Sequence, residues 1–118
     1  MSKHLGEFEK LLLFALLAGG EDTDGATLRQ QIEDRTGRVV SPGAVYTAMD
    51  RLQGRGFVAS QVVTAPPERG GRRQKRYRLT ADGALSLDRA VRELNSMADG
   101  LAEHLAAAVE SARTGEGQ

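Results

Sequence analysis

The basic side chains of this sequence gather in one short stretch, PPERGGRRQKRYRLT, at residues 66–80. Between residues 67 and 78 there is one acid, Glu68, and there are six of the sixteen basic residues: Arg69, Arg72, Arg73, Lys75, Arg76 and Arg78. The chain is nevertheless neutral overall, because residues 79–118 carry seven acids and three arginines. Guanidinium and ammonium groups pair with carboxylates and phosphates, so this segregated charge indicates a binding partner.

The sequence gives little support to catalysis or to metal binding. It has no cysteine, which rules out a disulfide scaffold and a thiolate metal site. Asp99, Glu103 and His104 are close in sequence, but metal chemistry needs more convergent ligands. The run RGGRRQK lacks the Lys-Ser/Thr ending of a phosphate-binding loop, and no Ser/His/Asp arrangement is evident. We therefore expect no enzyme, no metal site and no cofactor.

The most apolar run, LLLFALLAGG, is far shorter than the roughly 18 residues that a membrane span needs. It is not followed by the small-residue cleavage site of a secretory signal. A length of 118 residues suits one domain, or one domain with an appended element. We expect a soluble, cytoplasmic protein with no membrane partner.

Hydrophobic periodicity predicts three helices in the first half of the chain, at residues 5–18, about 25–36 and about 42–54. Asp24 can cap the second helix. Ser41 is a strong N-cap residue for the third, and Pro42 suits its first helical position. The third helix turns Val45, Met49 and Leu52 inward. Its opposite face carries Gly43, Tyr46, Thr47, Asp50 and Arg51.

Two strands are predicted next, GFVASQVVT at residues 56–64 and KRYRLT at 75–80, joined by a Pro/Gly/Arg loop. The alternation of the second strand places Tyr77 and Leu79 inward and Arg76 and Arg78 outward. The basic stretch therefore lies on the loop and the outgoing strand of a long hairpin.

The last predicted element is one long helix from the N-cap residue Thr80 to about Ala112. Its apolar positions repeat at alternating spacings of three and four, which is the pattern of a helix that pairs along its length. These positions are Ala84, Leu87, Val91, Leu94, Ala98, Leu101, Leu105, Ala108 and Ala112. A second copy of the chain would cover them, and packing on the first helix is the rival interpretation. Gly100 interrupts the helix at a cost of about 1 kcal/mol relative to alanine.

This order of elements predicts a mostly α fold with a small β-hairpin. It is typical of a winged helix-turn-helix, here at residues 1–80, followed by one long C-terminal helix at 81–113 and a disordered tail at 114–118. In such a module the third helix enters the major groove, about 12 Å wide. The loop of the hairpin, the wing (about 66–76), then reaches the flanking backbone or the minor groove, which explains the local positive charge. Double-stranded DNA is the predicted partner.

The runs VSPGAVYTAMDRLQGRGFV and GGRRQKRYRLTADG together resemble the PadR family of transcriptional regulators. The similarity extends from about Leu5 to Gly83, with a compatible final helix of the short-subfamily kind. It implies a homodimeric repressor in which the C-terminal helices associate with each other and with the partner's first helix. It also implies that Ser41, Gly43, Tyr46 and Thr47 face DNA and that the wing arginines hold its backbone.

These considerations define two sets of candidate residues. The DNA-binding set is Ser41, Pro42, Gly43, Tyr46, Thr47, Arg51, Arg69, Arg72, Arg73, Lys75 and Arg76. The dimerisation set is Leu87, Val91, Leu94, Ala98, Leu101 and Leu105, with Leu12 and Leu16 from the first helix. Asp50 is unfavourable beside phosphate and suggests that its part of the helix tilts out of the groove.

Three alternatives stay open. The module could bind protein instead, with the basic wing docking an acidic partner, or it could belong to a neighbouring winged-helix family such as MarR. A small apolar effector could occupy a cleft between the long and first helices of the dimer, where Ala98 and Ala108 leave room. The chain has no tryptophan, so the stacking of flat drugs seen in some short PadR relatives does not carry over.

Overall fold

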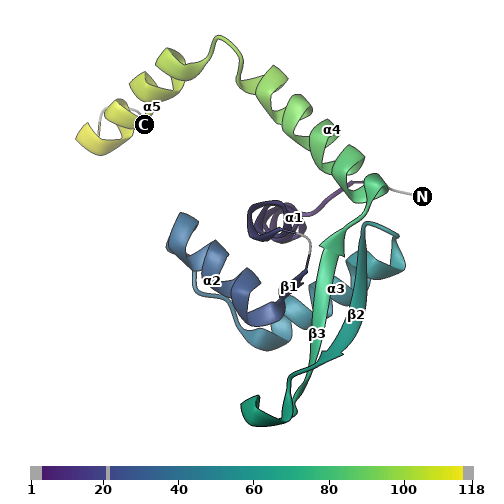
Figure 1. Cartoon of the computed structure of the whole chain (residues 1–118). Helices are drawn as coiled ribbons and strands as arrows, with labels where there is room; N and C mark the ends of the chain where they lie inside the picture. Colours follow the sequence, from purple (N-terminus) through teal and green to yellow (C-terminus); the bar gives the residue numbers. More distant parts are fainter. Residues whose placement is uncertain (1–3, 21, 116–118) are drawn as a thin grey trace. The chain divides into compact units, whose positions relative to one another are not determined.

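The computed structural model describes residues 4–20 and 22–115 (Figure 1). The elements are α1 (Glu7–Gly19), β1 (Thr23–Asp24), α2 (Gly25–Thr36), α3 (Pro42–Gly54), β2 (Val58–Thr64), the short 3₁₀ helix η1 (Pro67–Arg69), β3 (Arg73–Leu79), α4 (Ala81–Ala98) and α5 (Ala102–Thr114). The chain divides after Asp88 into two compact units. The predicted class, mostly helical with a small antiparallel sheet, is confirmed.

The helix starts follow the capping residues of the sequence. The Asp24 carboxylate accepts a hydrogen bond from the Thr27 backbone N–H at 2.7 Å, and the Ser41 hydroxyl accepts one from Ala44 at 3.1 Å. The Thr80 hydroxyl accepts from Gly83 at 3.0 Å and donates to the Gly56 carbonyl at 2.6 Å. Each side chain satisfies a backbone donor that the first helical turn leaves free.

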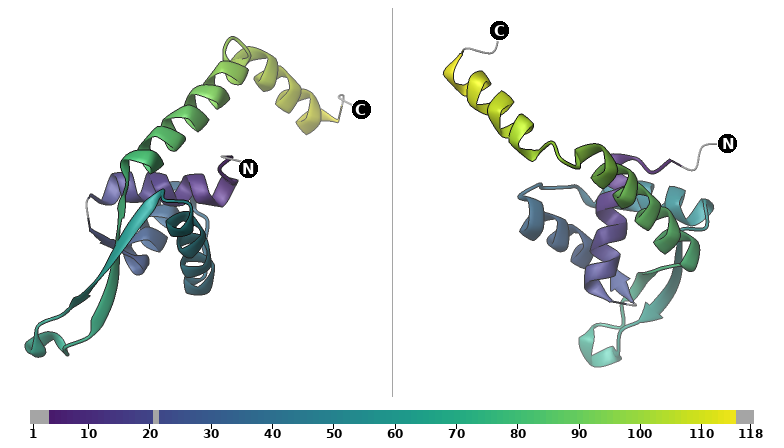
Figure 2. Two further views of the ribbon diagram at one scale, coloured as in Figure 1. Left: turned by 90° about the vertical axis from the view of Figure 1, so that its right-hand side faces the viewer. Right: turned by 90° about the horizontal axis from the view of Figure 1, so that it is seen from above.

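The sheet has the strand order β1-β3-β2, and both strand pairs are antiparallel. The predicted hairpin is β2–β3, and it extends beyond the three helices as a wing (Figure 2). Tyr77 is fully buried and Arg78 is exposed, which confirms the predicted alternation. The two-residue strand β1 was not predicted, because Thr23 and Asp24 carry no strand pattern of their own.

The core of the first unit lies between α1, α2, α3 and the sheet. Its fully buried side chains are Tyr77, Leu12, Leu13, Leu16, Leu28, Met49, Leu52 and Val45. The first turn of α4 closes this unit at Gly83, where a Cβ atom would lie 2.1 Å from the Phe57 carbonyl oxygen. Leu87, one turn later, is only 4% exposed. The compact unit therefore runs eight residues past Thr80.

The C-terminal part is helical as expected, but it forms two helices instead of one. Gly100 has a φ of +75°, and α4 ends at Ala98 while α5 begins at Ala102. A left-handed residue cannot continue an α-helix, and glycine adopts this conformation without steric cost. Thr114, placed in the tail by the sequence prediction, belongs to α5. Residues 116–118 of that tail lie outside the described residues.

Across residues 4–20 and 22–115, no helix combines the length and the apolar character that crossing a bilayer requires.

Candidate nucleic-acid interface

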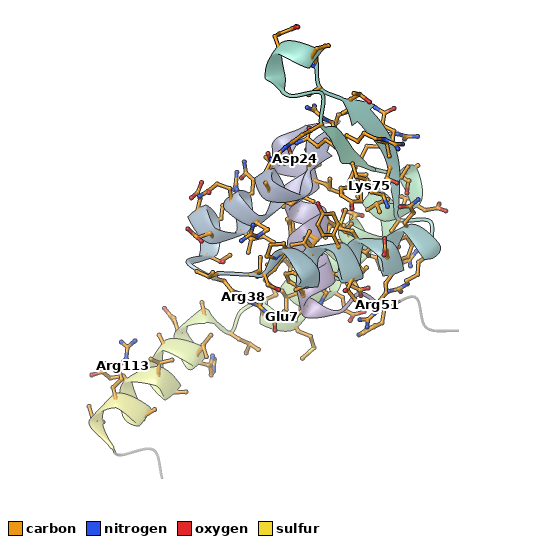
Figure 3. The ribbon with its side chains drawn as sticks, turned by 90° about the horizontal axis from the view of Figure 1, so that it is seen from below. Glu7, Asp24, Arg38, Arg51, Lys75 and Arg113 are labelled. Atoms are coloured by element: carbon orange, nitrogen blue, oxygen red, sulfur yellow. The ribbon has the colours of Figure 1, made fainter. Side chains whose placement is uncertain are left out.

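Helix α3 presents to solvent the face that the sequence predicted. Val45, Met49 and Leu52 are fully buried, whereas Tyr46 is 49% exposed. The other exposed candidates on this helix and its cap are Ser41, Pro42, Gly43, Thr47 and Arg51. A helix held by one apolar stripe leaves its opposite side free for a partner, and Figure 3 shows Arg51 on that helix.

The Tyr46 ring lies against the start of α2. A Cβ atom at Gly25 would be 3.6 Å from both Cζ and the hydroxyl oxygen of Tyr46. A small hollow of about 90 Å³ opens here, lined by Gly25, Ala26, Arg29, Pro42, Val45 and Tyr46. Arg29 Nε donates to the Val40 carbonyl at 3.0 Å, which fixes the linker between α2 and α3. Helix α3 is therefore held rigidly relative to α2.

The tip of the wing carries its exposed arginines. Gly70 and Gly71 have φ values of +95° and +63°, so the turn depends on their freedom to adopt the left-handed region. Arg72 and Arg73 are exposed, and neither guanidinium has a partner within the described part of the chain. The side chain of Arg69 lies outside the described residues. A hollow of about 630 Å³ on the hairpin is lined by Val63, Thr64, Ala65, Pro66, Arg72, Arg73, Gln74 and Arg76.

Arg76, nearer the base of the wing, is held by the protein itself. Its guanidinium donates two hydrogen bonds to Gln74 Oε1, at 3.3 and 3.1 Å. Gln74 in turn donates to the second carboxylate oxygen of Asp24 at 2.9 Å. Asp24 therefore caps α2 and anchors the wing at once. Sequence reasoning missed this chain of contacts, because it depends on the pairing of β1 with β3.

Lys75 also has an internal partner. Its ammonium nitrogen lies 3.8 Å from a carboxylate oxygen of Asp50 on α3 and 5.9 Å from the centre of the Tyr77 ring. Figure 3 labels Lys75 on its strand beside α3. The predicted basic residues of the wing thus differ in their contacts: Lys75 and Arg76 have partners within the protein, while Arg72 and Arg73 have none among the described residues.

The Tyr77 hydroxyl is buried and has no hydrogen-bond partner among the described residues. Burial raises the pKa of this phenol to about 12, with smaller contributions from Tyr46 and Asp50. The hydroxyl therefore stays neutral near pH 7, and Tyr77 acts as a core residue beneath the interface.

The candidate dimerisation residues fall into two groups. Leu12, Leu16 and Leu87 lie in the core of the first unit, with exposures of 0%, 1% and 4%. Leu94, Leu101 and Leu105 are 64%, 46% and 67% exposed. Ala98 is exposed and Val91 is half-buried. The exposed apolar residues of α1 are Phe14 and Leu17, which the helical stripe through Leu12 and Leu16 did not single out.

Within residues 4–20 and 22–115, no group of three or more His, Cys, Asp or Glu side chains is placed to hold a metal ion. The site therefore consists of a helix face and arginine side chains, which can bind an anionic partner without further chemistry.

The comparisons with known proteins agree with this geometry. Residues 13–89 match the family described as "Transcriptional regulator PadR-like family". A PadR family transcription regulator from hypervirulent Clostridium difficile R20291 has a TM-score of 0.69 at 22% identity, over 85% of this chain and 99% of that one. A PadR family regulator from Eggerthella lenta DSM 2243 has a TM-score of 0.66 at 25% identity, over 81% of both chains.

A third similar structure is F93 from STIV, a winged-helix DNA-binding protein. Its TM-score is 0.64 at 18% identity, over 82% of this chain and 97% of that one. Its similarity supports the winged-helix fold. Among curated protein sequences, none matches this chain significantly.

Proposed function

This chain belongs to the PadR-like family of transcriptional regulators, and we propose from that premise that it is a homodimeric repressor of a pseudo-palindromic DNA operator. Its family consists of regulators, not enzymes. One observation carries the proposal: the exposed face of α3 is followed in the same unit by a wing whose tip bears two exposed arginines with no partner among the described residues. A helix face suits the major groove, and wing arginines suit phosphates.

We assign the proposed roles according to which side chains are exposed and which already have partners within the protein. Tyr46, Thr47 and Arg51, with the helix start at Ser41, Pro42 and Gly43, meet the groove. Arg72 and Arg73 hold the backbone, and we place Arg69 with them from its sequence position. Arg76 acts mainly by fixing the base of the wing through Gln74. Binding would occur in the cytoplasm, at the nucleoid.

Dimerisation is supported by the apolar side chains that the second unit leaves exposed. Helix α5 has no buried residue, and Leu94, Met97 and Leu105 are each more than 60% exposed. A short helix that buries no residue is marginal in water, and a patch of this kind marks an interface. We propose that a second copy covers Leu94, Ala98, Leu101 and Leu105. The two recognition helices would then reach half-sites about 34–36 Å apart, or a multiple of that spacing.

A small apolar effector has one candidate place within the first unit. A hollow of about 410 Å³ between α1 and α2 is lined mainly by apolar side chains, among them Leu11, Phe14 and Ile32. Its volume falls in the range of small-molecule sites. A library of small apolar compounds tests this: we expect a hit to raise the melting temperature and release operator DNA, and a screen with neither effect argues against an effector.

The test of the proposed function is fluorescence anisotropy on duplex DNA. A selected duplex, obtained by enrichment from a random pool with the wild-type protein, is compared with a scrambled duplex across a salt series. We expect tighter binding to the selected duplex, with log K falling by about 0.9 per phosphate neutralised for each unit of log salt. Arg72→Ala/Arg73→Ala should weaken binding to both duplexes and leave the dimer intact.

The alternative function is a protein-binding module. The arginine-lined hollow of the wing could accept carboxylates of an acidic partner as well as phosphates. Equal, weak binding of all duplexes, with no sequence enriched from the pool, would favour this alternative over the repressor.

A further inference from the structure

The ion pair between Lys75 and Asp50 joins the wing to the recognition helix. Asp50 is the only acid in α3, and its side chain is 69% exposed, while that of Lys75 is 38% exposed. An exposed pair at 3.8 Å contributes little to folding, because solvent screens it and two side chains lose freedom. Stability of the fold therefore does not explain why this ion pair lies on the proposed DNA-binding face.

Lys75 differs from the arginines at the tip in its contacts with the rest of the protein. Because side chains alternate along a strand, Lys75 shares a face of β3 with the buried Tyr77 and leans toward α3. Arg73 shares this face but is exposed and unpartnered in the described chain. Lys75 is thus the basic residue of the wing that forms an ion pair with the recognition helix, through Asp50.

Asp50 follows Tyr46 by four residues and Thr47 by three, so it lies on the same exposed face of α3. A carboxylate there repels phosphates and only accepts hydrogen bonds. The major groove offers two such donors, the exocyclic amino groups of adenine and cytosine, and cytosine is the usual base partner of an Asp or Glu carboxylate. In the free protein the Lys75 ammonium group is paired with this carboxylate, at 3.8 Å.

We propose that Asp50 is a specificity-determining residue that reads a cytosine amino group and controls whether Lys75 can bind a phosphate. On unselected DNA the Asp50 carboxylate stays paired with Lys75, so Lys75 does not contact a phosphate. On a site with cytosine at the matching position, the cytosine amino group donates a hydrogen bond to the Asp50 carboxylate. Lys75 is then released and binds a phosphate of the DNA backbone. This inference rests on the proposed function, since it assumes that α3 meets duplex DNA.

The experiment compares Asp50→Ala with Glu33→Ala, an exposed acid of α2 whose removal changes the net charge equally. Both variants are titrated with the selected and scrambled duplexes across a salt series. For Asp50→Ala we expect tighter binding to the scrambled duplex and, on that duplex, a salt slope steeper by about 0.9, the value of one extra phosphate contact. The ratio of the two affinities should fall about tenfold, the size of one good base contact. Glu33→Ala should change neither the slope nor the ratio.

Adding Lys75→Gln to Asp50→Ala should remove the extra slope, because the released ammonium is then absent. Asp50→Asn, which keeps the side-chain shape, provides a second readout if alanine disturbs the fold: it should also steepen the slope.

Two results separate the possible failures. A wild-type protein that prefers the selected duplex, with Asp50 variants that match Glu33→Ala in slope and ratio, overturns this inference and leaves the repressor proposal standing. A wild-type protein with no preference among duplexes overturns both.

Discussion

The two units of this protein differ in how far they bury their apolar side chains. In the first unit, Leu12 and Met49 are completely buried between helices and sheet. In residues 89–115 no side chain is buried, although the apolar pattern of that segment is as regular as any in the chain. A regular apolar stripe can therefore be completed inside one chain or left for a partner, and the stripe alone does not distinguish the two cases.

The largest expected effect comes from truncating matched leucines in the two units. Leu12→Ala removes a fully buried side chain and should lower the free energy of unfolding by about 2–5 kcal/mol. Leu94→Ala, at 64% exposure, should leave the first unit intact and weaken the proposed dimer. Chemical denaturation and sedimentation equilibrium measure the two effects. Equal losses of unfolding free energy at both positions would contradict the view that Leu12 packs in a core and Leu94 does not.

The second prediction concerns Gly83, where the first unit ends. Gly83→Ala places a Cβ atom 2.1 Å from the Phe57 carbonyl oxygen, so backbone must shift, and we expect a loss of about 1–3 kcal/mol. Gly54→Ala is the matched control, because nothing lies within 4 Å of its added Cβ and its φ is not positive. The control should stabilise the protein by about 0.4–1 kcal/mol. A harmless Gly83→Ala would mean that α4 is not packed on the hairpin.

The third prediction tests whether tertiary contacts hold the break between α4 and α5. A Cβ at Gly100 meets no described atom within 4 Å, so local preference decides the conformation there. Alanine disfavours the left-handed backbone and gains about 1 kcal/mol of helix propensity over glycine. Gly100→Ala should therefore join the two helices, seen as helical backbone chemical shifts for residues 99–101. Shifts that stay non-helical would show that contacts beyond local preference, such as those of the proposed dimer, hold the break.

The sequence predicted those parts of the site that depend on local chemistry. Ser41 and Pro42 mark the start of α3, and the alternation around Tyr77 orients β3; both rest on neighbouring residues alone. The family resemblance, confirmed by the match over residues 13–89, placed these elements in a winged helix.

The contacts between distant segments could not be predicted in this way. The pairing of β1 with β3 brings Asp24 to Gln74, fifty residues away in the chain, and neither segment signals the other. Lys75 was predicted to bind DNA from its charge and its place on the wing, whereas its contact with Asp50 requires knowing how the hairpin leans on α3. Likewise, periodicity could not tell the buried Leu12 from the exposed Leu94.

The smallest effect is expected at Tyr77, whose buried hydroxyl has no hydrogen-bond partner in the described part of the chain. Burial raises its pKa from 10.0 to about 12, so folding favours the neutral phenol. This contribution to stability is complete below the unfolded pKa and declines as the pH rises from 10.0 toward about 12. Tyr77→Phe should abolish that alkaline decline, and at pH 7 it should change the free energy of unfolding by less than about 1 kcal/mol, toward stability, because an unpartnered buried hydroxyl is removed. Urea denaturation at pH 7 and through the alkaline range measures both effects, with Tyr46→Phe as a control that retains the Tyr77 phenol. A clear loss of stability of Tyr77→Phe at pH 7 would contradict this prediction and show that the Tyr77 hydroxyl is hydrogen-bonded in solution.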